Sequence, residues 1–278
     1  MNVDIDAVTT IIREVAAAFI LPRFRNLQPG DTSFKIGDDP VTIADQEAEL
    51  ALSERLMGLL EGSKVVGEEA FSTNRGVLER ISGPSPVWII DPIDGTRNFV
   101  EGNTEFGVIV ALAKQNQTIA GWLYDPTSAE VITAEKGAGA WYQGRKLKVA
   151  APTTLSEASG FLCGELYGAG QKAFGDNNIG PRFKPIRAGI HEYPRLLAGG
   201  PYFGATAPPI HFRASLRQSN PWDDAAGVLI HQEAGGYSAF WDGTPYRPSV
   251  MDKGLAVATD QARWDELAGW LARLTALS

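Results

Sequence analysis

The sequence contains very little cysteine, since Cys163 is the only one among 278 residues. No disulfide can form within the chain, and such sparing use of cysteine is typical of proteins from a reducing compartment. Long apolar runs are also missing, because no stretch approaches the roughly 20 residues that a membrane-spanning helix requires. The first ten residues, MNVDIDAVTT, carry two acids where a secretory signal would carry basic residues. A cytoplasmic protein that does not enter a membrane is therefore predicted.

Blocks of lysine and arginine are absent as well, and the formal net charge is −8. Proteins that bind long nucleic acids present a broad basic surface, so a nucleic-acid polymer is not expected as a partner. The three histidines share no metal-ligand spacing such as HExxH, which favours packing or surface roles over zinc binding. Apolar and charged fractions of 44% and 21% are ordinary for a globular protein, and part of the acidic surplus could bind a divalent cation.

Apolar periodicity predicts helices at the start of the chain and strands after them. Apolar residues recur at helical spacing over residues 5–21, until Pro22, and again over about 45–60. After Trp88, short apolar segments separated by turn residues predict an antiparallel meander. Its segments are EFGVIVALAK, TIAGWLYDP, EVITAEKG, GAWYQG and KLKVA.

The second half of the chain mixes helices with strands. A helix is expected over residues 223–234, closed by Gly235, then a strand at LAVAT and a terminal helix after Thr259. The pattern changes at APTT, which predicts a domain boundary near residue 150 and divides the chain into 1–150 and 151–278.

The densest chemical signal is WIIDPIDGTRNFVEG, which covers residues 88–102. An apolar strand runs into Asp91 and Asp94, with Pro92 between them. Pro92 stiffens the backbone, so the two carboxylates can converge on one point while the Ile93 carbonyl becomes a further oxygen ligand. Hard oxygen ligands of this kind suit Mg²⁺.

Gly95 and Thr96 follow directly and could begin a helix. The free N–H groups and the positive dipole end of a helix start favour phosphate, so a phosphate site would adjoin the metal site. A structural turn capped by aspartates is the competing interpretation, and for an isolated DxxD it is the commoner one. The full fifteen-residue context favours the metal and phosphate site.

Two further stretches present acids at the ends of regular elements. SKVVGEEA places Glu68 and Glu69 after a short β-rich run, and NPWDDAAG places Asp223 at the start of a helix. Each is ambiguous alone, because adjacent glutamates are usually solvated and an aspartate at a helix start usually caps it. Glu68, Glu69 and Asp223 indicate a metal site only when they are taken together with Asp91 and Asp94.

Together these segments resemble the inositol monophosphatase family, within the wider group that includes fructose-1,6-bisphosphatases and bisphosphate nucleotidases. GEE, DPIDGT and WDxAAG occur in the family's order and at about its spacing, and VTIADQE resembles the family's VTxxDxxxE segment. The resemblance spans most of the chain. It implies an α+β fold, namely a layered αβαβα sandwich with an antiparallel sheet in the N-terminal half and a smaller mixed sheet in the C-terminal half. It also implies a homodimer.

The resemblance also implies roles for individual residues. Two or three Mg²⁺ ions would be held by Glu68, Asp91, the Ile93 carbonyl, Asp94 and Asp223, with Glu69 as an outer helper. Thr96, linked to Asp45, matches the pair that orients the attacking water, and catalysis would also depend on Glu68. Gly95 and Thr96 match the phosphate-binding turn, beside Asp94 and Asp223. Lys35 corresponds to a lysine in the mobile loop of relatives.

These roles imply a Mg²⁺-dependent phosphomonoesterase acting on a small phosphorylated alcohol. Adjacent metal ions can lower the pKa of bound water, align it for in-line attack and neutralise charge on the departing alkoxide, so no phosphoenzyme is required. Neither Cys163 nor any serine lies in a nucleophile motif, which disfavours covalent catalysis. A catalytically silent relative is the non-enzymatic alternative, disfavoured because the ligand set is complete.

The substrate-reading region departs from the family pattern. Inositol-cleaving relatives carry a glutamate about seven residues before the aspartate that matches Asp223, and here that position is Leu216. Residues 193–222 contain no acid but three arginines, which are Arg195, Arg213 and Arg217. Arginines favour a second phosphate or a carboxylate, whereas an acid would accept hydrogen bonds from polyol hydroxyls. The hypothesis is a more anionic substrate, such as fructose 1,6-bisphosphate or 3′-phosphoadenosine 5′-phosphate, with exposed arginines in an altered loop as the alternative.

Overall fold

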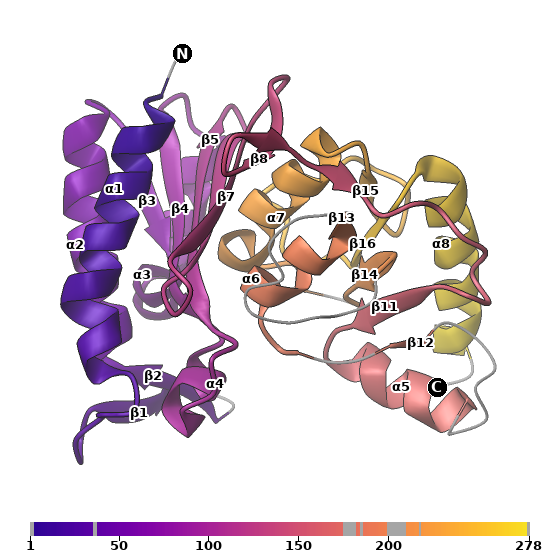
Figure 1. The fold of residues 1–278 in the computed structure, drawn as a ribbon, viewed down its shortest axis with the longest axis horizontal. Helices are drawn as coiled ribbons and strands as arrows, with labels where there is room; N and C mark the ends of the chain where they lie inside the picture. The colour runs from indigo at the N-terminus through magenta and orange to yellow at the C-terminus, as the bar shows by residue number, and fades with distance from the viewer. Residues whose placement is uncertain are drawn as a thin grey trace.

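Two helices form the outer layer beside a large sheet (Figure 1). The computed structural model describes residues 3–35, 38–174, 182–183, 186–198, 210–216 and 218–276. Helix α1 (Ile5–Val15) starts at the cap Asp4 and continues through one π turn (Ala16–Ile20) into a 3₁₀ turn (Leu21–Arg23). Helix α2 (Ile43–Leu59) follows a small hairpin of β1 (Thr32–Lys35) and β2 (Asp39–Thr42). Both helices that the apolar periodicity predicted are confirmed.

The larger sheet has seven strands in the order β3-β4-β5-β6-β7-β8-β9. β3 runs parallel to β4, and every other neighbouring pair is antiparallel, so the predicted meander is confirmed and the sheet as a whole is mixed. The short helix α3 (Glu68–Thr73) and a 3₁₀ segment (Arg75–Ser82) connect β3 to β4. The strands are β3 (Lys64–Gly67), β4 (Val87–Asp94), β5 (Gly107–Lys114), β6 (Gln117–Asp125), β7 (Glu130–Glu135), β8 (Gly139–Tyr142) and β9 (Arg145–Lys146).

The segment KLKVA, expected as the last strand of the meander, is divided between two sheets. β9 completes the seven-stranded sheet, whereas β10 (Lys148–Val149) pairs with β13 (Leu197–Ala198). Leu147 between them is buried in the core and marks the turn of the chain from one pairing to the other.

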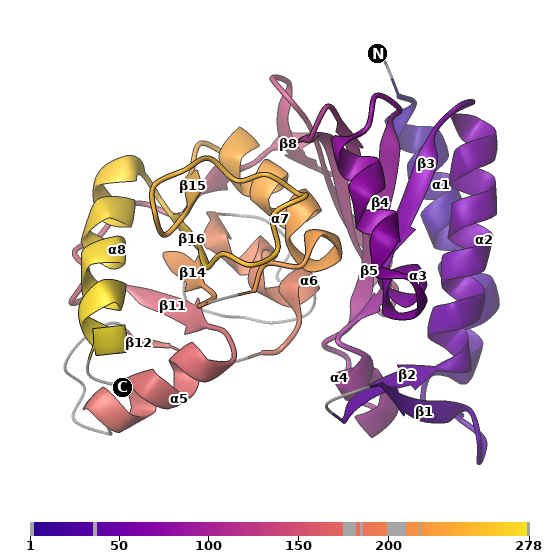
Figure 2. The same ribbon diagram turned by 180° about the vertical axis from the view of Figure 1, so that it is seen from behind.

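A second helix layer lies between the two sheets, as the view from behind also shows (Figure 2). It contains α7 (Pro221–Glu233) and the single turn α6 (Gly189–Glu192), which leads into a 3₁₀ turn (Pro194–Leu196). α7 packs against the inner face of the larger sheet along β4 to β8. Because buried residues occur all round α7, this helix has a core on both sides.

The smaller sheet has five strands in the order β12-β11-β14-β16-β15 and contains both parallel and antiparallel pairs. Its strands are β11 (Ser159–Leu162), β12 (Arg182–Phe183), β14 (Phe212–Ala214), β15 (Tyr237–Phe240) and β16 (Leu255–Ala258). Helices α5 (Glu165–Phe174) and α8 (Gln261–Ala276) cover its outer side (Figure 1). The layered αβαβα architecture is therefore confirmed.

The largest buried cluster draws on both halves of the chain, with Ile109 of β5, Trp222 of α7 and Leu255 of β16 among its members. The domain boundary near residue 150 stays a prediction. Within the described parts of the chain, no helix combines the length and the apolar character needed to cross a membrane.

Candidate metal centre

The two aspartates of DPID lie at the end of β4, where the strand pairing becomes irregular. Residues three apart in a regular strand point to opposite faces, but the register of β4 against β5 shifts between Asp91 and Asp94. The Asp91 carboxylate also accepts a hydrogen bond from the Ile93 N–H, at 3.0 Å, which tightens the turn. This irregularity lets both carboxylates face the same space.

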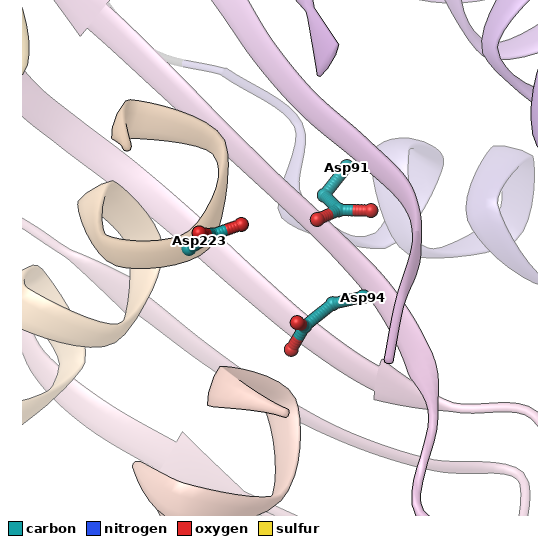
Figure 3. Close-up of side chains that lie close together, drawn as sticks. All are labelled: Asp91, Asp94 and Asp223. Carbon is teal, nitrogen blue, oxygen red and sulfur yellow. The ribbon is translucent and has the colours of Figure 1, made fainter. Parts of the chain in front are cut away.

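Asp223 reaches that space from the first turn of α7. Asn220 donates a hydrogen bond from Nδ2 to Asp223 Oδ2, at 3.0 Å, and the backbone N–H of Ile190 donates to Asp94. One carboxylate oxygen from each of Asp91, Asp94 and Asp223 lies within 4.8 Å of the others (Figure 3). The structure thus brings together three of the four carboxylates that the sequence assigned to one metal site.

Burial makes this cluster electrostatically unfavourable without a cation. Burial and then the charge of Glu68 raise the pKa of Asp91 well above its usual range, and burial and then Asp223 do the same to the pKa of Asp94. Burial and Glu68 raise the pKa of Asp223 to about 7. Two buried carboxylates and a half-buried one that repel one another are stabilised by a hard divalent cation, so this donor set fits Mg²⁺.

Glu68 stands at the edge of the cluster and is paired with a lysine. Lys35 Nζ lies 2.9 Å from Glu68 Oε1 and 2.6 Å from Glu69 Oε1. Burial lowers the pKa of Lys35, but the two glutamates raise it by more, so the pKa ends above its usual value and the ammonium stays charged. Glu68 is outside the group of three whose oxygens lie within 4.8 Å of one another, yet it is close enough to raise the pKa of Asp91 and Asp223.

Glu49 is a supporting residue that the sequence reasoning did not single out. Its carboxylate accepts hydrogen bonds from the backbone N–H groups of Glu69 and Ala70, both at 2.8 Å, and so caps α3. A Cβ on Gly67 would lie 2.2 Å from the Glu49 carboxyl carbon, so only glycine permits this approach. The last acid of the VTxxDxxxE pattern falls on Glu49 and was the available signal.

Thr96 is placed between the two groups that its hydroxyl can reach. Its Oγ1 lies 3.1 Å from Asp45 Oδ1 and 2.9 Å from the Ile93 carbonyl oxygen. Asp45 is itself held by the backbone N–H of Thr42, at 2.8 Å, and burial raises the pKa of Asp45 to about 7. These contacts hold Thr96 beside the end of β4 and link it to Asp45, while its role in orienting water stays a prediction.

Gly95 has a left-handed backbone, with φ of 88°, immediately before the short helix α4 (Thr96–Glu101). A Cβ at this position would lie 2.7 Å from the Glu105 carbonyl oxygen. Both the conformation and the space therefore require glycine at the turn that the resemblance assigns to phosphate.

A cavity of about 370 Å³ opens beside Asp94 and Asp223 and reaches Tyr167 of α5. Glu192, Arg213 and the exposed Arg187 also line this cavity. Of these three, only Arg213 was expected from the sequence. Arg187 and Glu192 lie within three residues of Gly189, in a stretch without a recognisable motif, so only the fold identifies them as lining residues.

The three arginines proposed to recognise the substrate lie in different environments. Arg213 is buried and forms ion pairs with Glu192, at 2.7 Å, and with Asp224, at 2.8 Å. Arg195 is buried and does not line the cavity, and burial lowers its pKa. Arg217 lies outside the described residues. Among the described arginines, only Arg213 of the proposed set reaches the cavity, and its charge is already compensated.

Carboxylates that meet at the junction of a strand end and a helix start, beside a cavity, form a candidate divalent-cation centre in this layered α+β protein. The model of the inositol monophosphatase family matches residues 2–276. The chain belongs to this family, which confirms the resemblance and implies a phosphatase.

Similar proteins agree with the assignment. The chain is 32% identical over 252 residues to an inositol-1-monophosphatase of Rhizobium meliloti, covering 87% of this chain and 86% of the relative. It is 30% identical over 205 residues to a fructose-1,6-bisphosphatase/inositol-1-monophosphatase of Thermotoga maritima, covering 74% and 72%. The solved structure of a Thermotoga maritima IMPase superimposes with a TM-score of 0.78, covering 97% of each chain, and at 23% identity it shows a shared fold.

Proposed function

We propose that this protein is a Mg²⁺-dependent phosphomonoesterase that hydrolyses a small phosphorylated alcohol. The observation that carries the proposal is the convergence of Asp91, Asp94 and Asp223, from two elements far apart in the chain, beside a cavity of about 370 Å³. Membership of a phosphatase family supports the same reaction class.

Two or three Mg²⁺ ions would be held by the three clustered aspartates together with Glu68 and the Ile93 carbonyl. When bound, they supply Lewis acidity that lowers the pKa of water and stabilises charge on the departing oxygen. The carboxylates must be deprotonated to act as ligands, and their raised pKa values make cation binding dependent on pH.

Thr96 and Asp45 would orient the attacking water. Thr96 has one hydroxyl proton, which it can donate to Asp45 or to the Ile93 carbonyl. Its oxygen lone pairs then remain to accept a hydrogen bond from water, and the anchored Asp45 keeps the hydroxyl in place. Correct orientation of a nucleophile before attack lowers the barrier substantially.

The phosphate would bind at the turn formed by Gly95 and Thr96, next to Asp94 and Asp223. The left-handed Gly95 turns the chain sharply from β4 into α4, and backbone N–H groups at such a turn favour an anion.

A bisphosphorylated substrate is a second candidate, supported by one observation. Arg187 is exposed and lines the cavity next to the acid cluster, and a guanidinium there could pair with a second phosphate. One relative is also named for fructose-1,6-bisphosphatase activity. Parallel turnover measurements on monophosphates and bisphosphates discriminate the two candidates.

Phosphate release from a panel of phosphorylated metabolites, with Mg²⁺ or with EDTA, tests the proposal. We expect release only with Mg²⁺ and a loss of at least about 1000-fold in Asp94→Asn, because a neutral amide weakens the cation site. Asp242→Asn, at an exposed loop, is the matched control and should retain activity. Unchanged turnover in Asp94→Asn, or full activity in EDTA, would contradict the proposal.

A further inference from the structure

A separate cavity of about 240 Å³ lies at the end of α7 that is remote from the acid cluster. Gln232 and Glu233, from the last turn of this helix, line it. With a rise of about 1.5 Å per residue, Asp223 at the start of α7 lies about 14 Å from Gln232 along the helix axis. The described residues that line this cavity all differ from those that line the cavity beside Asp94, so the two are distinct.

The segments that form the walls of this cavity are tied to one another. Glu233 accepts hydrogen bonds from the N–H groups of Gly137 and Gly139, at 2.7 and 2.8 Å, which fixes the turn between β7 and β8 against α7. Asn116, at the turn between β5 and β6, accepts from the N–H of Ser249 at 3.1 Å and so holds the loop after β15. The cavity is therefore preformed, which reduces the ordering cost when a ligand binds.

Two cations and one acid are found among the described residues that line the cavity. The cations are Lys136 and Arg247, and the acid is Glu233. Arg247 is half-buried, and no hydrogen-bond acceptor or ion-pair partner for its side chain is found in the described part of the chain. Both oxygens of Glu233 are engaged by main-chain N–H groups. The wall therefore carries an excess of positive charge and an uncompensated guanidinium.

The free hydrogen-bonding groups of the cavity are mainly donors. A guanidinium presents five N–H donors in a planar fork that matches carboxylate and phosphate oxygens. Lys136 gives one N–H to the side-chain oxygen of Gln117, which also lines the cavity, and keeps two more. Val228 and Leu229 of α7 are buried apolar residues in the same wall, and apolar surroundings strengthen the attraction between opposite charges.

We propose that this cavity binds a small oxyanion, a phosphate or carboxylate group held by Arg247 and Lys136. The volume of about 240 Å³ is below the range for drug-sized ligands, which restricts the ligand to a small ion or metabolite. The site goes beyond the proposed phosphatase reaction, because no residue of the acid cluster contributes to it.

Calorimetric titration of the metal-free protein tests the site, with inorganic phosphate and succinate as the two probes. Metal is removed with EDTA, which is then dialysed away, and the ionic strength is kept low because salt screens such contacts. We expect saturable binding of one anion per chain. Tighter binding of phosphate would identify a phosphate-bearing ligand, and tighter binding of succinate would identify a carboxylate-bearing one.

Variants assign the binding to this cavity. Arg247→Gln should weaken it about tenfold or more, the effect of removing a charged hydrogen-bond partner. Lys136→Gln, at an exposed position, should weaken it too and replaces Arg247→Gln as the test if thermal denaturation shows that the latter is unfolded. Arg273→Gln, at an exposed position on α8, is the matched control and should bind as the wild-type protein does.

Three outcomes would overturn the inference. They are the absence of saturable binding of either probe, an unchanged affinity in both cavity variants, and an equal loss in the control Arg273→Gln. Loss of phosphate binding in Asp94→Asn would also overturn it, because the anion would then lie at the metal centre. None of these titrations depends on catalysis, so Mg²⁺-dependent phosphate release tests the proposed function separately.

Discussion

Lys35 places its ammonium group between Glu68 and Glu69, 2.9 Å and 2.6 Å from one oxygen of each. The lysine lies on β1 and the two acids open α3, so the ion pair joins the small hairpin to the edge of the acid cluster. In the absence of a metal ion, this is the closest positive charge to Glu68 among the described residues.

Removal of that charge should destabilise the metal-free protein. We expect Lys35→Met to lower the free energy of unfolding by about 1 kcal/mol in EDTA, the magnitude of a partly exposed ion pair with two partners. Because a divalent cation also compensates the acids, the difference should shrink when Mg²⁺ is added. Urea denaturation of the wild-type protein and Lys35→Met, with and without Mg²⁺, measures this difference in the free energy of unfolding. A loss of equal size under both conditions would argue that Lys35 acts independently of the metal site.

The raised pKa values predict how stability changes with pH. Asp223, Asp45 and Glu49 each have a folded-state pKa of about 7, above the value of about 4 for these groups in an unfolded chain. The folded state therefore binds more protons between these values. The stability of the metal-free protein that these groups contribute is present below about pH 4 and is lost as the pH rises through about 7.

Mg²⁺ should reverse that loss, because it binds the deprotonated carboxylates. We expect the increase in Tm on adding Mg²⁺ to be larger at pH 8 than at pH 5.5. Thermal denaturation at both pH values, with EDTA as the metal-free condition, checks this. Asp223→Asn provides the control, and its Mg²⁺-dependent increase should be small at both pH values. A wild-type increase that does not depend on pH would contradict the assignment of the cation to these acids.

Thr96 tests the orientation of water separately from metal binding. Thr96→Ala should lower kcat by roughly 100-fold, at the low end of the range for a positioned proton-transfer group, while the Mg²⁺ concentration at half-maximal activity stays nearly constant. Thr96→Ser keeps the hydroxyl beside Asp45 and should recover most of the activity. Phosphate-release kinetics across a Mg²⁺ titration measure both quantities. Equal activity in the alanine and serine variants would show that the hydroxyl is not used.

Gly95 and Gly144 allow a comparison of how much stability is lost when a side chain is added at a position of positive φ. Gly95 has φ of 88° and a Cβ there would lie 2.7 Å from the Glu105 carbonyl oxygen, whereas Gly144 has φ of 74° and nothing within 4 Å. Gly144→Ala should cost about 1 kcal/mol from its conformation alone. Gly95→Ala should cost more, because backbone must also move. Chemical denaturation of the two variants compares their free energies of unfolding. Equal losses of stability would mean that the backbone at Gly95 relaxes around the added Cβ without cost.

Local sequence determined most of the secondary structure and which stretches carry the chemistry. Helical periodicity identified α1 and α2 because their buried faces repeat every three to four residues, whereas α7 was expected from its end signal, Gly235. Asp91 and Asp94 at the end of the buried strand β4 pointed to a metal site because two closely spaced carboxylates can converge on one hard cation. The motif order was sufficient to identify the family.

Only the tertiary structure determined which residues from distant parts of the chain contact one another. Glu192 and Arg213 are 21 residues apart in the chain and meet only because α6 packs against α7 and Arg213 of β14 pairs with Asp224 of α7. The sequence showed three arginines without acids around them, but the fold supplies Glu192 and Asp224 as partners to Arg213. Charge compensation depends on distance in space, which no spacing along this chain could reveal.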